Sequence, residues 1–274
     1  MIRILTDSAA DMNGVEGVDI VPLKVQIGTE EYLDGVNLNR DTFYTRLISE
    51  KEFPKTSQPA PQDFLAAFEK AKEEQDDLIC ILLSSALSGT YQSANIAKNI
   101  VDYDRIYLID SLTTTYAARL LAEKAMKVIE QGYTAEEIVQ TIETLKSKVK
   151  IVASVDTLDY LCKGGRLSAG SAALGNLAKI KPIITVSKEG TVSVIAKKIG
   201  MRKTISYITD TLCAASIDTD TPIYLIYTYG TVNASLLKER LESLDFNVSD
   251  PRQIGPAIGA HVGPEAFGII YLEK

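Results

Sequence analysis

Short apolar runs alternate with amphipathic helical patterns through the first half of the chain. Three runs have the length and composition of buried strands: IRILTD at 2–7, LICILLS at 78–84 and RIYLID at 105–110. Between the first two, an apolar stripe at helical spacing comprises Phe64, Leu65, Phe68 and Ala71. Strands that alternate with helices are typical of a parallel sheet covered by helices, and we expect this helix to lie against that sheet.

Local signals mark the ends of two further helices. Thr134 is followed three residues later by Glu137, which is the spacing of a capping box and predicts a helix start. Gly132 follows the pattern LLAEKAMKVIEQ and is well placed to end the preceding helix.

The pattern changes after about residue 150. The stretch 183–199 predicts two strands joined through Lys188–Gly190, a hairpin typical of a mixed sheet. PIYLIYTY at 222–229, a helix at 234–244 and FGIIYLE at 267–273 complete a second α/β unit, and we expect the glycines from Gly255 to Gly268 to form a compact loop. The sequence thus predicts an α/β protein of two domains: a parallel-sheet domain at 1–150 and a mixed-sheet domain at 151–274.

Composition narrows the classes of partner. The 274 residues carry 29 basic and 36 acidic side chains, a net charge of -7, which argues against a nucleic-acid surface. No signal peptide or membrane-spanning run is evident, so we expect a cytoplasmic protein. Cys80, Cys162 and Cys213 are widely spaced, which predicts reduced, mostly buried thiols and no metal site. Any chemistry that needs imidazole must use His261, the single histidine.

Three polar stretches follow predicted strands or lead into predicted helices. TDSAAD carries Thr6, Asp7, Ser8 and Asp11, and by itself is best explained as a turn that caps a short helix. KTSQPAP at 55–61 leaves the hydroxyls of Thr56 and Ser57 free to bond outward. SSALSGT at 84–90 should present free backbone N–H groups near Ser88, Gly89 and Thr90 at a helix start, which favours an anion.

The absence of known nucleotide-binding and hydrolase motifs limits which kind of anion we expect the chain to bind. The chain has no GxxxxGK[ST] and no GxGxxG, so we do not expect it to bind a nucleotide. It also lacks GxSxG, and a Ser-His-Asp hydrolase would have to recruit His261 from the far end of the chain. Hydroxyls and backbone amides suit a carboxylate or one set of phosphate oxygens.

Three basic residues could supply compensating charge. Arg202 lies in KKIGMRKT near a predicted helix start, where a solvated surface arginine is the commoner case. His261 lies between glycines that allow a ligand to approach the backbone. Arg166 follows two glycines and precedes a predicted alanine-rich helix; an anion site, a structural turn and a partner contact all remain open for it.

Six motifs together resemble those of the DegV family, in order and approximate spacing over nearly the whole chain: TDSAAD, TSQPAP, SSALSGTYQSA, GGRLS, KKIGMR and HVGPEA. The resemblance implies a two-domain α/β protein that binds a long-chain fatty acid. It also implies a non-catalytic role, as the fatty-acid-binding subunit of a bacterial fatty acid kinase, whose partner subunit phosphorylates the bound carboxyl group. No cofactor or metal would then be needed.

The resemblance assigns roles to individual positions. Thr56 and Ser88 would bind the carboxylate, together with Ser57, Gly89 and Thr90 around them. His261 would lie at the carboxylate or the transferred phosphate. Arg202 would act in phosphoryl transfer or kinase docking, and product delivery would involve an acyltransferase or a membrane surface.

Two positions depart from the family pattern. Glu265 replaces a small residue, and we expect its carboxylate to face away from the site or pair with a basic residue. The residues after Asp110 and Ser111 match the family loosely, which leaves Thr113–Thr115 with no predicted role beyond starting a helix.

Two other functions compete with the lipid carrier. An acyl ester or acyl-phosphate hydrolase would use Ser88 as nucleophile and His261 as base. A lipid-sensing interaction or transcriptional protein would need a DNA-binding surface that the acidic balance disfavours.

Overall fold

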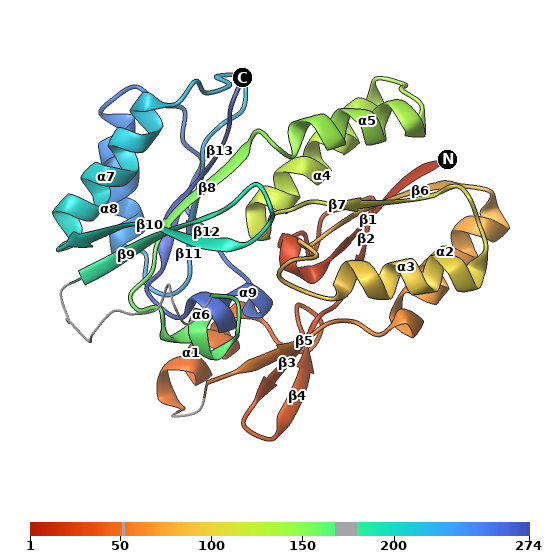
Figure 1. Ribbon diagram of the computed structural model, residues 1–274, viewed down its shortest axis with the longest axis horizontal. Helices are drawn as coiled ribbons and strands as arrows, with labels where there is room; N and C mark the ends of the chain where they lie inside the picture. The colour runs from red at the N-terminus through yellow and green to blue at the C-terminus, as the bar shows by residue number, and fades with distance from the viewer. Residues whose placement is uncertain (51–52, 168–179) are drawn as a thin grey trace.

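The computed structural model describes residues 1–50, 53–167 and 180–274. The amino-terminal part holds a four-stranded parallel sheet in the order β2-β1-β6-β7 (Figure 1). Its strands are β1 Ile2–Asp7, β2 Val18–Val21, β6 Asp77–Leu82 and β7 Ile106–Asp110. The three predicted apolar runs are therefore neighbouring strands, and the predicted parallel sheet is confirmed.

Helices cover both faces of this sheet. On one face, α2 Pro61–Glu74 and α3 Thr90–Val101 form an apolar cluster with alternate strand residues such as Leu5 and Leu78. On the other face, α4 Thr115–Glu130 and α5 Ala135–Leu145 pack with the intervening residues, such as Ile4. Successive strand side chains point to opposite faces, so burial of both faces requires the continuous apolar runs seen in the sequence.

The predicted helix ends between α4 and α5 are confirmed. The Thr134 N–H donates to the Glu137 carboxylate over 2.9 Å, and the Thr134 hydroxyl accepts from the Glu137 N–H in return. Gly132 has φ +84° and donates its N–H to the Ile129 carbonyl over 2.9 Å, closing the end of α4. The left-handed backbone at this position explains the glycine.

A second sheet has six strands in the order β10-β9-β8-β13-β11-β12. Its strands are β8 Val149–Ser154, β9 Ile180–Val186, β10 Val192–Ile199, β11 Tyr224–Tyr227, β12 Arg252–Gln253 and β13 Phe267–Leu272. The β11–β12 pair is parallel and the other pairs are antiparallel, so the sheet is mixed as predicted, and β9–β10 is the predicted hairpin.

Helices α7 Met201–Ala214 and α8 Val232–Glu242 pack on the outer face of the second sheet. The inner face joins the same apolar cluster as α4, which contacts strands of both sheets. Figure 1 shows α4 between the two sheets.

Helix α8 confirms the helix predicted at 234–244. The division into domains 1–150 and 151–274 stays a prediction.

A third, three-stranded antiparallel sheet lies below these two in Figure 1, in the order β4-β3-β5. Its strands are β3 Lys24–Ile27, β4 Glu30–Leu33 and β5 Lys55–Ser57. Three helices gather beside it: α1 Arg40–Ser49, α6 Asp159–Lys163 and α9 Pro256–Val262. Segments from both ends of the chain therefore meet at β5.

The prediction of a compact loop from Gly255 to Gly268 is wrong. Residues 256–262 form α9, and β13 begins at Phe267. Pro256 occupies the first turn of α9, where a missing N–H costs nothing, and Gly263 with φ +75° ends the helix. The alanine-rich helix predicted after Arg166 lies outside the described residues.

Candidate functional site

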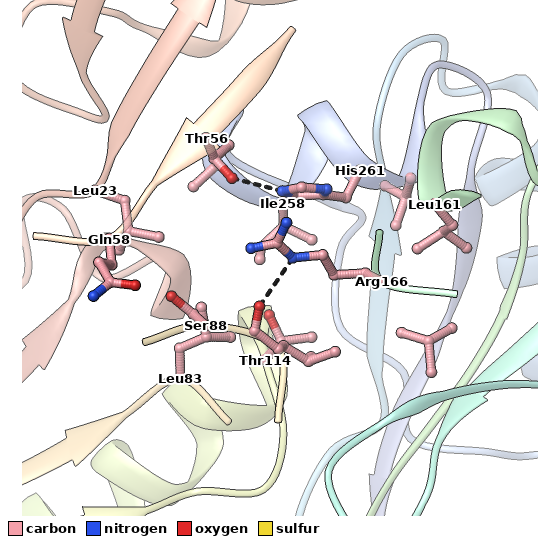
Figure 2. Close-up of a pocket in the computed structure, with 14 residues that line it drawn as sticks. Leu23, Thr56, Gln58, Leu83, Ser88, Thr114, Leu161, Arg166, Ile258 and His261 are labelled. Atoms are coloured by element: carbon pink, nitrogen blue, oxygen red, sulfur yellow. Dashed lines mark hydrogen bonds between the residues drawn. The ribbon is translucent and has the colours of Figure 1, made fainter. Parts of the chain in front are cut away.

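A cavity opens where the third sheet, α9 and the two larger sheets meet; its unfilled space, open solvent included, is about 520 Å³. Figure 2 shows its polar side chains converging from separate segments, with Arg166 extending between His261 and Ser88. It is lined by Leu23, Thr56, Gln58, Leu83, Leu87, Ser88, Thr114, Leu161, Arg166, Val192, Ala257, Ile258, His261 and Val262.

Strand β5 brings Thr56 to the cavity and turns Ser57 away from it. Thr56 lines the cavity and is partly buried, whereas Ser57 is exposed and does not line it. Alternate residues of a strand point to opposite faces, so the Ser57 hydroxyl faces away from the cavity that Thr56 lines. Gln58 lines the cavity beside Thr56 and was not singled out in the sequence. A Cβ at Gly89 would lie 2.0 Å from Gln58 Oε1, so any side chain there would displace the Gln58 amide.

The hydroxyls of SSALSGT have separate partners. Ser84 Oγ donates to the Gly190 carbonyl over 2.9 Å and so binds the β9–β10 turn, and Ser85 Oγ donates to the Asp110 carboxylate. Ser88 lines the cavity, with its Oγ 2.8 Å from Thr90 Oγ1. Thr90 is buried, does not line the cavity and orients Ser88.

The predicted free amides are largely absent from this turn. The Ser88 N–H donates to the Ser84 carbonyl over 3.1 Å, and the Thr90 N–H donates to Ser88 Oγ over 3.3 Å. The prediction of a nest of free N–H groups at residues 88–90 is therefore wrong for Ser88 and Thr90. Local turn bonds satisfy these donors, so side chains supply most of the polar groups that face the cavity.

His261 lies in the last turn of α9, and its Nε2 is 2.6 Å from Thr56 Oγ1. Burial, together with the nearby Arg166 guanidinium, lowers its pKa from 6.5 to about 4, so the imidazole is neutral near pH 7. Nδ1 is buried without a hydrogen-bond partner among the described residues. A Cβ at Gly164 would lie 2.3 Å from Nδ1, so the glycine makes room for the ring.

Arg166 contributes the guanidinium nearest to this histidine. Its Nε donates to the Leu87 carbonyl over 3.0 Å and its Nη1 to the Gly164 carbonyl over 2.5 Å. These bonds connect the GGR turn to the residue before Ser88 and hold the cation at the cavity wall (Figure 2). The two bonds to backbone carbonyls fit the structural turn, and the position at the cavity wall fits the anion site, so the role of Arg166 stays a prediction.

The polar residues of TDSAAD do not line the cavity. They form a capped turn, as the helix-capping interpretation predicts. Asp7 caps a 3-10 helix at Ser8–Ala10 and accepts from the Leu83 N–H over 2.7 Å, while its burial raises its pKa to about 6. Asp11 accepts from the Gly255 N–H over 2.7 Å and pairs with Arg40 over 3.0 Å. Asp11 thus anchors the start of the helix that carries His261 at its other end.

A second cavity, hereafter the apolar chamber, adjoins the first; its unfilled space, open solvent included, is about 500 Å³. The two share wall residues Thr114, Val192, Ile258 and Val262. Aliphatic side chains form most of its wall, among them Ile151, Ile184 and Ile226 of the second sheet, and Phe267 closes another part. The site therefore has a polar end and an apolar end.

Two predicted features lie elsewhere. Arg202 is exposed at the start of α7 and does not line either cavity, so the structure does not bring it beside His261. Glu265 is exposed and also absent from both walls. Thr113–Thr115 precede or start α4, and Thr114 additionally lines both cavities.

The cysteines are free thiols, but only Cys80 is buried; Cys162 is partly exposed and Cys213 is exposed, so the prediction of mostly buried thiols is wrong. Within the described ranges, no group of three or more His, Cys, Asp or Glu side chains could hold a metal ion. No helix in those ranges is long and apolar enough to cross a bilayer.

The fold and this site define an α/β protein with two adjoining cavities, one with a partly polar wall and one with an apolar wall. A family model described as "Uncharacterised protein, DegV family" matches residues 1–274. A DegV domain-containing protein of Caldanaerobacter subterraneus subsp. tengcongensis is 37% identical over 283 residues, covering 100% of this chain and 99% of the relative. The chain belongs to the DegV family.

Two solved structures are similar over the whole length. One is a structure of a DegV family protein from Thermus thermophilus that is described as showing fatty acid binding. Its TM-score is 0.89 at 27% identity, and the match covers 100% of this chain and 99% of the other. The other is the Streptococcus pneumoniae Fatty Acid Kinase (Fak) B3 protein loaded with linoleic acid, at TM-score 0.89 and 26% identity, with 100% of both chains covered.

Proposed function

We propose that this chain binds one long-chain fatty acid, with its carboxylate among Thr56, Ser88 and Arg166 and its tail in the apolar chamber. The observation that carries the proposal is that a cavity with a partly polar wall and an apolar cavity lie side by side and share four wall residues. Each tail CH₂ that leaves water contributes about 0.8 kcal/mol, so the chamber would supply most of the affinity. The relatives described as fatty acid binding support the same ligand class.

The polar end suits a carboxylate in particular. Arg166 offers a cation fixed by two carbonyl contacts, and the Thr56 and Ser88 hydroxyls can donate to a carboxylate oxygen. His261 would complete the site by donating its Nε2–H to Thr56 Oγ1, which leaves the Thr56 hydroxyl proton free for the ligand. Gln58 adds an amide at the same wall.

We further infer that the bound carboxylate is presented to a separate kinase subunit. A carboxylate oxygen would form a bond to the phosphoryl phosphorus while the bond from that phosphorus to the donor's leaving group breaks. The donor would be held by the partner, and the similarity to the Fak B3 protein supports this role. The involvement of Arg202 in docking, and delivery of product to an acyltransferase or membrane surface, stay predictions.

Native mass spectrometry tests the ligand class directly. The purified protein is weighed intact and then denatured, and the released molecule is identified. A stoichiometric fatty acid is the expected result. A protein without ligand that also fails to take up added palmitate would contradict the proposal.

Variants of neighbouring hydroxyls test the placement of the head group. Ser88→Ala should weaken palmitate binding about tenfold or more, since one hydrogen bond to a charged group is worth about 1.5–3 kcal/mol and tail burial is unchanged. Ser57→Ala is the matched control, because Ser57 is exposed on the opposite face of β5. Equal affinities of the two variants in a competition assay would place the carboxylate elsewhere.

No observation favours the hydrolase. The Ser88 hydroxyl is paired with Thr90, and His261 with Thr56, so neither contact sets up Ser88 for deprotonation by the imidazole. The protein alone should therefore leave acyl esters and acyl-phosphates intact.

A further inference from the structure

One polar residue belongs to the walls of both cavities of the candidate site. Four of the described residues line the first cavity as well as the apolar chamber: Thr114, Val192, Ile258 and Val262. Of these four, only Thr114 has a polar side chain. Figure 2 draws it in the wall of the first cavity, which also holds Ser88. A fatty acid that extends from the first cavity into the chamber would therefore pass Thr114 near its carboxyl end.

The Thr114 hydroxyl has no partner among the described residues. The residue is 8% exposed, and its Oγ1 is buried without a hydrogen bond. Thr114 is also the N-cap of α4, where a threonine hydroxyl ordinarily accepts from a backbone N–H of the first turn, but the side chain makes no such bond. Leaving a buried hydroxyl unpaired is unfavourable, so nearly all such groups have a partner. The unpaired hydroxyl therefore indicates a polar atom supplied by a ligand.

The residues on either side of Thr114 are held in place. The Thr113 carbonyl accepts from the Ser84 N–H over 2.9 Å, and the Thr115 hydroxyl donates to the Asp11 carboxylate over 2.7 Å. Thr115 has φ +48°, a left-handed conformation that is uncommon for a β-branched residue. Backbone in such a conformation persists where surrounding contacts hold it. Thr114 is thus a fixed part of the wall.

The other two hydroxyls in the wall of the apolar chamber are already bonded. Thr185 Oγ1 donates to the Ile151 carbonyl over 2.7 Å, and Thr115 Oγ1 donates to Asp11. A buried water needs roughly two to four polar partners, and the described side chains on this side of Thr114 offer no second one. An unsubstituted alkyl tail has no polar atom. An oxygen on the ligand's chain would satisfy the Thr114 hydroxyl.

We propose that the preferred ligand is a hydroxylated long-chain fatty acid, with its hydroxyl on carbon 2 or 3 and hydrogen-bonded to Thr114. This inference rests on the proposed function, because it assumes that Thr56 and Ser88 hold the carboxylate. Thr114 lines the same cavity as these two residues, which places the chain hydroxyl close to the carboxyl end. A site that bonds a ligand hydroxyl discriminates against the analogue without it, because the protein group is then left buried and unpaired.

Four ligands with the same chain length test the inference. Palmitate, 2-hydroxypalmitate, 3-hydroxypalmitate and 16-hydroxypalmitate are titrated into the delipidated protein below their micelle-forming concentrations. We expect the 2-hydroxy or the 3-hydroxy acid to bind about fivefold more tightly than palmitate, which is the effect of one neutral hydrogen bond. The 16-hydroxy acid should bind more weakly than palmitate, because its hydroxyl enters the apolar chamber without a partner.

The decisive variant is Thr114→Val, which removes the hydroxyl and keeps the branched shape. It should abolish the preference for the hydroxy acid over palmitate, and α4 loses no cap bond, because the hydroxyl makes none. The matched control is Thr185→Val, which removes a chamber hydroxyl that is already bonded to the Ile151 carbonyl. Its ratio of the two affinities should equal that of the wild type. A rise of Tm on adding palmitate checks that each variant is folded.

Each remaining outcome decides the matter. If the wild type binds palmitate and both hydroxy acids equally, or if Thr114→Val keeps the preference, Thr114 is not a hydroxyl site, although the fatty acid proposal stands. If Thr114→Val weakens palmitate and the hydroxy acids by the same factor, Thr114 bonds the carboxylate, directly or through a water, and the hydroxy acid assignment fails. If the protein binds none of the four ligands, the proposed function itself fails.

Discussion

Fatty acid binding should raise the pKa of His261. In the free protein, burial and Arg166 lower this pKa from 6.5 to about 4, because both disfavour the imidazolium. That difference corresponds to about 3 kcal/mol. A carboxylate about 4 Å from the ring, at an effective dielectric constant of about 20, would contribute about 4 kcal/mol in the opposite direction. We therefore expect a pKa of about 6 or above in the complex.

The sign of the pH dependence follows by linkage. The complex takes up a proton between the two pKa values, so affinity for the carboxylate should rise as the pH falls from 7 toward 5. In the free protein, the unfolded chain binds a proton on His261 more readily than the folded one. The stability contribution of neutral His261 is thus present above about pH 6.5 and is lost as the pH falls toward 4.

The assay is an NMR titration of the imidazole carbons. His261 is the single histidine, so its resonances need no separate assignment. Spectra are recorded with no ligand, with saturating palmitate, and with methyl palmitate, which has the same tail without the charge. Methyl palmitate should leave the pKa low. A free-protein pKa near 6.5 would refute the burial argument, and an unchanged pKa with palmitate would refute the placement of the carboxylate.

Three further changes test other parts of the site. Arg166→Gln should raise the pKa of His261 in the free protein and weaken palmitate binding about tenfold or more, measured by NMR and competition; no change in either would remove Arg166 from the site. Gly164→Ala should displace the His261 ring, since its Cβ would lie 2.3 Å from Nδ1, and lower Tm by several degrees in a thermal melt. An unchanged Tm would contradict that packing. Ala266→Leu fills part of the apolar chamber, so calorimetry should show affinity falling more for stearate than for decanoate; an equal loss for both would place the tail elsewhere.

Local pattern predicted most of the secondary structure. The strands at 2–7 and 78–84 and the capping box of Thr134 and Glu137 were found from sequence, since burial periodicity and cap bonds depend on near neighbours. The helix at Pro256–Val262 was missed, because its glycines resemble a loop. Packing against β3, β5 and α1 overrides the low helical propensity of glycine there.

For the candidate site, too, the sequence located some residues and missed others. The motifs located Thr56, Ser88 and His261, all of which line one cavity. The sequence could not separate Thr56 from Ser57, because the choice depends on which face of β5 meets the cavity. Gln58 is part of the TSQP motif, but nothing in the sequence distinguishes it from its neighbours as a cavity residue.

The sequence by itself determined the fold class, the family motifs and the residue types able to hold an anion, because these depend on composition, periodicity and short spacings. Only the tertiary structure decided that Arg166 meets His261 while Arg202 lies apart, since the loops that carry them are placed by long-range packing. It also decided which apolar residues line the chamber. A chamber wall and a solid core use the same aliphatic side chains, and only their arrangement in space distinguishes a cavity from a packed interior.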